Sequence, residues 1–159
     1  MVKIFRVLPN ETSKINEVNE FIAGKHPVVS AIYMPECGHC KDLIPKWNAA
    51  SQQIQDGYKG NAVIALVHMD SLNSLQLPKD KIQGYPHIMS YHGNREHEYH
   101  GERSKQNLLD FMIKNGKLTP NIRGGARKKR RSRRTITKRG KKTRRNKKTK
   151  RKKTRRKRC

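Results

Sequence analysis

The 159-residue sequence predicts an α/β protein with a mixed central sheet and helices on both faces. Short runs of β-branched and apolar residues alternate with longer segments whose apolar residues recur at helical spacing. The run at 62–69, AVIALVHM, is apolar almost throughout, as expected of a central strand covered on both faces. Gly93 and Asn94 separate two later strand-like runs, which predicts a hairpin and hence an antiparallel part of the sheet.

The first elements are expected to be a strand, a helix and a second strand. The first strand covers residues 4–8. Thr12 or Ser13 is expected to cap a helix that ends at Gly24, because the apolar residues between them fall on one helical face. The second strand, at 28–33, is rich in β-branched and aromatic residues, as a buried strand requires.

A long helix is expected next, from about Gly38 to Tyr58. Pro45 lies inside it and is expected to bend it, because proline removes a backbone donor and clashes with the preceding turn. Beyond the strand at 62–69, residues 71–83 are expected to be irregular, since Pro78 limits any helix to short pieces.

The last elements are a strand at 87–92, a hairpin turn, a strand at 95–100 and a helix. Ser104 is expected to cap this helix and Gly116 to end it. With right-handed crossovers, this order of elements leaves few other ways to assemble the sheet.

Two cysteines three residues apart, Cys37 and Cys40, directly follow the strand at 28–33. If the helix begins near Cys37, its thiol lies against unpaired backbone N–H groups and the positive end of the helix dipole, which favour the reactive thiolate. Cys40 is then one turn further on, close enough to attack a mixed disulfide formed at Cys37. The pair is therefore predicted to be a dithiol/disulfide switch.

Two alternatives remain for this pair. The cysteines could be inert thiols, or they could form half of a zinc site. Zinc needs about four ligands, and no second pair of cysteines with this spacing occurs. Histidines of the two late strands could supply the rest, but we expect them at the surface: His87, His92, His97 and His100.

The run CGHCKDLIPKW, residues 37–47, resembles the catalytic domains of protein disulfide isomerases, which have the thioredoxin fold. Gly84, Tyr85 and Pro86 are similar to the cis-proline loop of that family, and YHGERS at 99–104 is similar to its last strand and final helix start. The resemblance covers residues 1–118. It implies a thiol-disulfide oxidoreductase of the oxidase or isomerase type that uses a cysteine pair and needs no cofactor or metal.

The resemblance implies roles around the cysteines. Cys37 would be the nucleophile and Cys40 the resolving thiol. His39 would stabilise the Cys37 thiolate and so raise the reduction potential. Arg103 matches an arginine that can swing toward the second cysteine and lower its pKa. The alternatives are an exposed histidine without a role and a surface arginine at a helix start.

The resemblance also implies how a client protein binds. A cis Pro86 would face the cysteines and offer the Tyr85 backbone to an extended client segment, by addition of a strand. The alternative is an ordinary trans turn. Glu36 stands where the family has a tryptophan, and its carboxylate is expected to raise the pKa of Cys37 and to disfavour acidic clients.

Two further positions depart from the family. Ala31 stands where the family carries a buried carboxylate that shuttles protons for the second cysteine, and His68 replaces the lysine that pairs with it. Losing both together avoids a buried unpaired charge but removes a proton acceptor. Attack by Cys40 is therefore expected to be slow.

Residues 119–159 are expected to be a linker followed by a disordered tail. The segment 121–159 holds 24 of the 38 lysines and arginines and no acid, whereas residues 1–120 carry 14 bases and 12 acids. Such a composition buries too little surface to fold alone. The repeated KKTRR at 141–145 and 152–156 indicates low complexity rather than a folded repeat.

The tail is expected to bind DNA or RNA electrostatically, without sequence preference and with a steep dependence on salt. An anionic membrane surface and a nuclear address are alternative explanations of the same charge. Threonines within the tail could be phosphorylated, which would weaken its binding. Cys159 could link two chains through a disulfide or could have no role.

The sequence shows neither a signal peptide nor a run of apolar residues long enough to span a membrane, so we expect a non-secretory protein. The nucleus, the cytoplasm or a nucleic-acid-rich particle such as a virion would suit it, and the architecture resembles the redox proteins of large DNA viruses. An alternative function is a nucleic-acid-binding or packaging protein, whose domain is a client-binding or structural platform with weak redox activity.

Overall fold

A computed structural model describes residues 1–121, and the remaining 122–159 lie outside the described part. The strands are β1 (Lys3–Val7), β2 (Val28–Tyr33), β3 (Tyr58–Lys59), β4 (Val63–His68), β5 (His87–His92), β6 (Arg95–Glu98) and β7 (Thr119–Pro120). The helices are α1 (Thr12–Ala23), α2 (Gly38–Gly57) and α3 (Lys105–Asn115), with a 3₁₀ helix at Met69–Ser74.

Five strands form one sheet in the order β1-β4-β2-β5-β6. β1, β4 and β2 run parallel, whereas β5 is antiparallel to β2 and β6 is antiparallel to β5. The sheet is therefore mixed, as predicted, and its antiparallel part is the hairpin that turns at Gly93, whose φ of +62° suits glycine.

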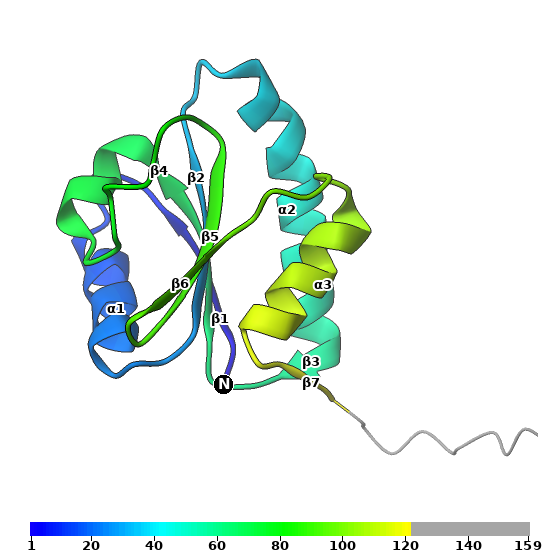
Figure 1. Ribbon diagram of the computed structural model, residues 1–159. Helices are drawn as coiled ribbons and strands as arrows, with labels where there is room; N and C mark the ends of the chain where they lie inside the picture. Colours follow the sequence, from blue (N-terminus) through cyan, green and yellow to red (C-terminus); the bar gives the residue numbers. More distant parts are fainter. Residues whose placement is uncertain (122–159) are drawn as a thin grey trace, which may run out of the picture. The chain divides into compact units, whose positions relative to one another are not determined.

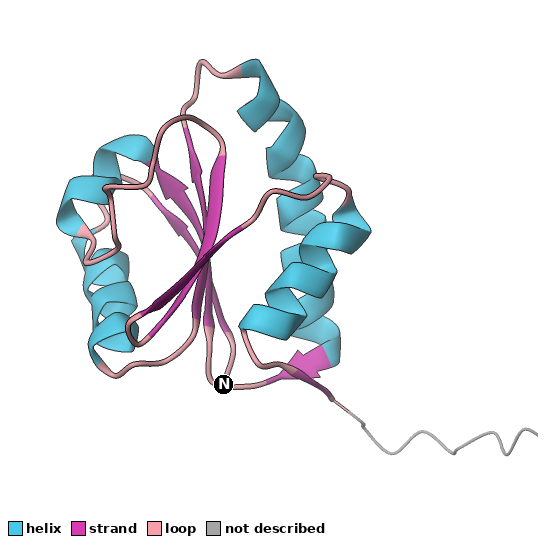
Figure 2. Cartoon of the chain, in the orientation of Figure 1, coloured by secondary structure: helices cyan, strands magenta, loops and turns pink. Residues whose placement is uncertain are grey.

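The helices cover both faces of this sheet (Figures 1 and 2). α1 lies on one face, and α2 and α3 pack on the other. β2 is buried along its whole length, because its side chains alternate between the two cores. Val29, Ala31 and Tyr33 join the core under α2 and α3, whereas Val28 and Ile32 join the core under α1.

Most helix ends lie where the sequence places them. Ser104 Oγ accepts a hydrogen bond from the Asn107 N–H at 3.2 Å and caps α3, and Gly116 ends that helix, as predicted. The prediction for α1 is wrong at its start: Thr12 lies inside the helix and Glu11 precedes it. The Glu11 carboxylate accepts from the Leu8 N–H at 3.0 Å and pairs with Lys14 at 2.6 Å, and these contacts fix the entry into the helix.

One predicted linker segment belongs to the folded unit. Thr119 and Pro120 form β7, which pairs antiparallel with β3, and the Asn121 N–H donates to the Gly57 carbonyl at 2.7 Å. Local sequence does not show this pairing, because its partner lies about 60 residues earlier along the chain. The polybasic segment and Cys159 lie outside the described residues.

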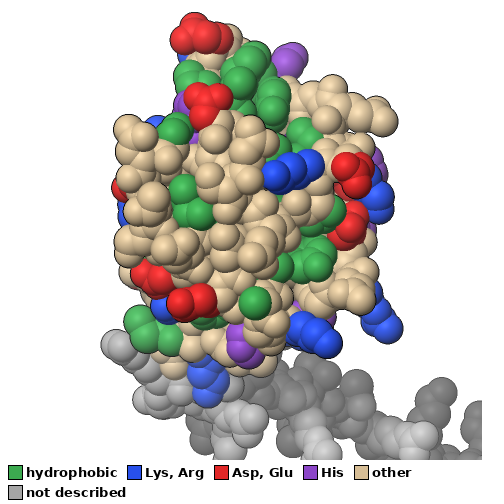
Figure 3. All heavy atoms as spheres, turned by 90° about the vertical axis from the view of Figure 1, so that its left-hand side faces the viewer, with side chains coloured by type: hydrophobic (Ala, Val, Ile, Leu, Met, Phe, Trp, Pro, Cys, Tyr) green, Lys and Arg blue, Asp and Glu red, His purple; other side chains and the backbone are tan. Residues whose placement is uncertain are grey.

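Within residues 1–121, no helix is both long and apolar enough to cross a bilayer. On the face that carries α1, basic and acidic side chains are interspersed (Figure 3). This mixed surface agrees with the nearly balanced count of 14 bases and 12 acids in residues 1–120.

Candidate active site

The two cysteines lie at the start of α2, beyond the end of the central strand β2. Cys37 has extended backbone angles and directly precedes the helix, while Cys40 lies in the first turn. Cys37 is half-buried, and Cys40 is fully buried in the core under α2 and α3. The sequence prediction of a leading sulfur at the helix tip with a sheltered sulfur behind it is confirmed in this arrangement.

The groups around the Cys37 thiol favour its ionisation. A hydrogen bond from the Cys40 thiol is the largest cause that lowers the pKa of Cys37 below its ordinary value. The backbone N–H groups of Cys40 and His39 and the charge of Arg103 lower this pKa further, while burial opposes them. Cys37 is thus a stronger nucleophile at neutral pH than a free cysteine would be.

Cys40 has the opposite character. Burial, and then the hydrogen bond and charge of Cys37, raise the pKa of Cys40 to about 11. A backbone hydrogen bond at Met34 and the charge of Arg103 oppose this rise. The two sulfurs therefore have distinct properties: one ionises readily and faces the surface, and the other holds its proton in the core.

The loop before β5 contacts the leading sulfur. The Tyr85–Pro86 peptide bond is cis, as predicted, and the Cys37 thiol donates a hydrogen bond to the Tyr85 carbonyl at 3.5 Å. Pro86 is buried, and Tyr85 is half-buried against both cores. A loop 48 residues further along the chain thus forms one wall of the dithiol site.

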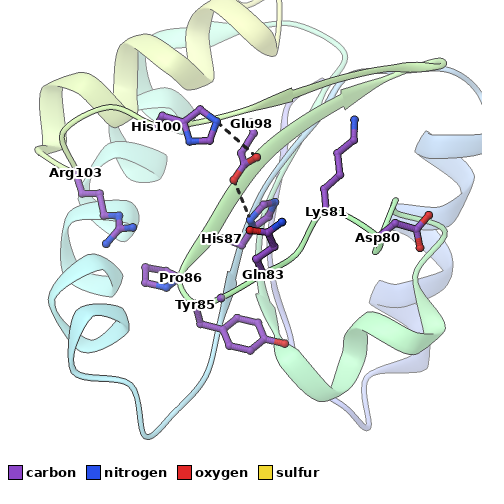
Figure 4. A pocket seen from close by; sticks show the side chains of 10 residues that line it. Asp80, Lys81, Gln83, Tyr85, Pro86, His87, Glu98, His100 and Arg103 are labelled. Atoms are coloured by element: carbon purple, nitrogen blue, oxygen red, sulfur yellow. Dashed lines mark ion pairs between the residues drawn. The ribbon is translucent and has the colours of Figure 1, made fainter.

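A pocket of about 490 Å³ extends from this loop to the segment between β6 and α3. Arg103 lies on its wall, beyond Pro86, and Lys81 and Asp80 approach it from the preceding loop (Figure 4). The charge of Arg103 lowers the pKa of both cysteines, and its movement toward Cys40 stays a prediction.

Glu36 and His39 flank the leading cysteine and are exposed. The pKa of Cys37 lies below its ordinary value although the Glu36 carboxylate is adjacent in sequence. The backbone N–H of His39, rather than a buried imidazole, is among the groups that lower this pKa. The roles of Glu36 toward clients and of the His39 imidazole stay predictions.

The core beneath Cys40 holds no carboxylate at the position of Ala31. Ala31 is fully buried in the same core as Cys40, between Leu66 on β4 and Ile88 on β5. His68 ends β4, where its Nδ1 accepts from the Asp70 N–H at 3.2 Å and its ring lies edge-on to Tyr33. Both departures from the family pattern therefore occupy the core face that carries the cysteine pair.

Sequence reasoning missed one polar group at the pocket. We expected His87 at the surface, but its exposed fraction is only 6%, because it starts β5 on the same sheet face as buried Met89. Its Nδ1 lies 3.4 Å from Glu98, whose other oxygen lies 3.6 Å from His100 Nε2, so the carboxylate sits between two imidazoles (Figure 4). Burial lowers the pKa of His87, and Glu98 partly offsets this.

A signal for this group was present in the sequence. His87 and Met89 are two residues apart on the strand and so share one sheet face, and the hairpin register places Glu98 opposite Met89.

In residues 1–121, no group of three or more histidine, cysteine or acidic side chains has an arrangement that could hold a metal ion.

Fold and site together define a class: a domain with a thioredoxin fold and a dithiol at a helix start, facing a cis-proline loop. The thioredoxin family profile matches residues 10–130, so the chain belongs to the thioredoxin family.

Curated relatives are named protein disulfide-isomerases. The chain is 34% identical over 110 residues to protein disulfide-isomerase tigA of Aspergillus niger, which covers 64% of this chain and 30% of that protein. It is 31% identical over 87 residues to protein disulfide-isomerase A4 of Homo sapiens, and the match covers 54% of this chain and 13% of that protein. It is 32% identical over 109 residues to protein disulfide-isomerase of Zea mays, and the match covers 65% of this chain and 20% of that protein. The chain thus spans at most 30% of the length of these three relatives.

Solved structures agree on the fold. The J-Trx1 fragment of ERdj5 superposes with a TM-score of 0.53 at 22% identity, covering 72% of this chain and 52% of that one. The zinc-bound form of human ERp44 superposes with a TM-score of 0.51 at 21% identity, covering 69% and 31%. At these identities the likeness establishes the fold alone.

Proposed function

We propose that this domain is a thiol-disulfide oxidoreductase of the oxidase or isomerase type, with Cys37 as the exchanging sulfur and Cys40 as the resolving sulfur. The asymmetry of the two thiols carries the proposal. The pKa of half-buried Cys37 is lowered, whereas the pKa of buried Cys40 is raised to about 11. A client can therefore reach only the sulfur that ionises.

As an oxidase, the domain begins with a Cys37–Cys40 disulfide. A client thiolate attacks the Cys37 sulfur, the Cys37–Cys40 bond breaks, and Cys40 leaves as a thiolate that takes up a proton. A second client thiolate then attacks the client sulfur of the mixed disulfide and releases the Cys37 thiolate. The client loses two electrons as its disulfide forms, and the domain gains them as a dithiol.

As an isomerase, the domain begins as the dithiol. The Cys37 thiolate attacks a client disulfide, and the freed client thiolate can then attack another client disulfide or return to the mixed disulfide. Cys40 can attack the mixed disulfide and release the client only after losing its proton. Its high pKa, together with Ala31 in place of a proton acceptor, gives the client time to rearrange.

The walls around Cys37 suit an extended client segment. The Tyr85 carbonyl accepts a hydrogen bond from the reacting sulfur, and the loop that carries it would pair with an extended client strand. The pocket lined by Arg103 and Lys81 lies next to the loop and would take client side chains that flank the reacting cysteine. Exposed Glu36 disfavours acidic clients.

The test measures insulin reduction and the refolding of a scrambled disulfide protein with the full chain. Cys37→Ser should abolish both activities, and Cys159→Ser serves as the matched control, because it makes the same substitution at the cysteine outside the pair. Unchanged activity in the Cys37→Ser variant would end the proposal.

We further propose that residues 121–159 hold the domain near nucleic acid. The support is compositional: 24 lysines and arginines and no acid in this segment. If about eight phosphate contacts form, the logarithm of affinity should fall with the logarithm of salt concentration with a slope of about −7. The same charge favours a nucleic-acid-rich location, such as the nucleus or a virus particle.

This second proposal has its own test. A chain that lacks residues 122–159 should lose most of its affinity for random-sequence DNA, and a slope near zero for the full chain would contradict the electrostatic account. The buried Ala31 favours one alternative, a packaging protein with weak redox turnover. That alternative predicts nucleic-acid binding with little insulin reduction by the full chain.

A further inference from the structure

A second pocket of about 300 Å³ lies between the β5–β6 hairpin and the end of α3. The buried Ser90 and the half-buried His92 and Asn115 contribute to its lining. Because His92 ends β5 and His87 begins it, the pocket is at the opposite end of the strand from the cis-proline loop, about 17 Å away at the rise of a strand. A ligand bound there would leave the dithiol open.

Three cations meet at this pocket from two separate parts of the fold: Arg95 at the start of β6, Lys114 in the last turn of α3, and Lys117 just beyond that helix. All three are exposed, and within residues 1–121 none of them has an ion-pair partner. The one carboxylate in the lining, Glu96, is paired with Lys81 at 2.8 Å. The pocket is therefore strongly positive, unlike the mixed surface over α1 (Figure 3).

Contacts within the domain do not explain why these three cations lie together at the pocket. The helix dipole favours a cation at Lys114, but it gives no reason for Arg95 on the strand. Two carbonyls in the last turn of α3 already have donors, since Met112 accepts from the Gly116 N–H at 2.8 Å and Ile113 accepts from the Leu118 N–H at 3.0 Å.

Lys117 has a φ of +52°, a left-handed conformation that glycine adopts more easily. The preceding residue must be glycine, because a Cβ at Gly116 would meet the Met112 carbonyl oxygen at 2.7 Å.

The charge of the pocket affects the pKa of His92. Burial is the main cause that lowers the pKa of His92, and the charges of Lys117 and Arg95, with a smaller effect of His26, lower it further. The field of the cations thus reaches the inner wall of the pocket and disfavours any further positive charge there. An anion would reverse this field.

We propose that this pocket binds a phosphate group, and that a nucleic-acid backbone supplies it. Three donors of positive charge around a concave site suit the oxygens of phosphate, which accept charge-assisted hydrogen bonds from arginine and lysine. A lipid headgroup is less suitable, because the large hydrophobic side chains exposed in residues 1–121 are Met1 and Leu8, neither of which lines the pocket. The proposal does not depend on the redox activity.

The test follows residue-specific NMR signals of the full chain during titration with inorganic phosphate. The His92 ring and the backbone amides of Ser90 and Lys117 should shift together, and the pKa of His92 should rise as phosphate binds. The triple variant Arg95→Gln, Lys114→Gln, Lys117→Gln should require about 3- to 125-fold more phosphate for the same shift, since each exposed pair contributes about 1.4- to 5-fold.

The matched control is Lys46→Gln, Lys79→Gln, Lys105→Gln, which removes three exposed cations outside the pocket and should leave the titration unchanged. Equal midpoints in the two triple variants, or no phosphate-dependent shift at the pocket signals, would overturn the proposal. Alkylation of Cys37 at an unchanged rate shows that the pocket variant is folded, and it separates this test from that of the redox function.

The source of the phosphate is resolved by two further titrations. A 12-nucleotide single-stranded DNA should shift the same pocket signals at lower concentration than inorganic phosphate, and the pocket variant should lose this response. Vesicles of phosphatidylserine and phosphatidylcholine should leave the pocket signals in place. Pocket shifts with vesicles but none with the oligonucleotide would overturn the nucleic-acid source.

Discussion

Release of a client from the mixed disulfide on Cys37 should accelerate steeply with pH. When the client carries no second thiol, release depends on attack by the Cys40 thiolate, and burial and the neighbouring Cys37 raise the pKa of Cys40 to about 11. Part of that rise disappears once Cys37 is bonded to a client, but the contribution of burial remains. Since Ala31 supplies no proton acceptor, the thiolate fraction of Cys40 sets the rate.

The magnitude follows from this pKa. With this pKa as an upper limit, about one Cys40 in 10,000 is ionised at pH 7, against about 3% of a free cysteine with a pKa of 8.5, so release should be slower than for an ordinary thiol of equal reactivity by up to about 300-fold. The rate should rise about tenfold per pH unit at least up to pH 8.5, because the pKa of Cys40 in the folded domain lies above the ordinary cysteine value and therefore above this pH range.

The assay loads a fluorescent cysteine peptide onto Cys37 and follows its release in single turnovers from pH 6 to pH 8.5. Cys40→Ser is the control and should hold the peptide at every pH, which excludes release by solvent or by other groups. A release rate that is constant across this range, or that levels off near pH 7, would refute the reasoning, because some group other than the buried thiol would then take the proton.

Two further predictions concern charge and packing near the site. Arg103→Gln should raise the pKa of Cys37 and slow its alkylation by iodoacetamide at pH 7, whereas Lys105→Gln should not; equal rates would show that Arg103 does not act on the dithiol. Trp47→Ala should lower the free energy of unfolding by about 3 to 5 kcal/mol in urea titrations, because Trp47 on the inner face of α2 is only 1% exposed. Lys46→Ala, on the exposed face of the same helix, should change it by less than about 0.5 kcal/mol.

The pattern of the sequence predicted the sheet class and most helix ends, because these depend on local spacing. Ser104 and Gly116 are examples: a side-chain cap and a glycine stop act within one turn. The predicted start of α1 was wrong, since the helix begins at Thr12 itself and no side chain caps it; the Glu11 carboxylate accepts instead from the Leu8 N–H before the helix. No local pattern distinguishes a threonine that caps a helix from one that follows the cap.

The pairing of β3 with β7 could not be predicted in the same way, because Lys59 and Thr119 meet only in the folded chain. The hairpin register indicates that Glu98 lies near His87, but the burial of His87 depends on what packs over that face of β5. The burial of His87 in particular contradicts the expectation that the histidines of the two late strands lie at the surface.

By itself, the sequence determined that a cysteine pair stands at a helix start after a buried strand, since strand composition, the spacing of three and the following proline are local properties. Only the tertiary structure decided which chemistry each sulfur has. The pKa values of Cys37 and Cys40 are moved apart by burial and by groups that include Arg103, far away along the chain. Solvation and charge act through space, so their effect is fixed only when distant segments pack together.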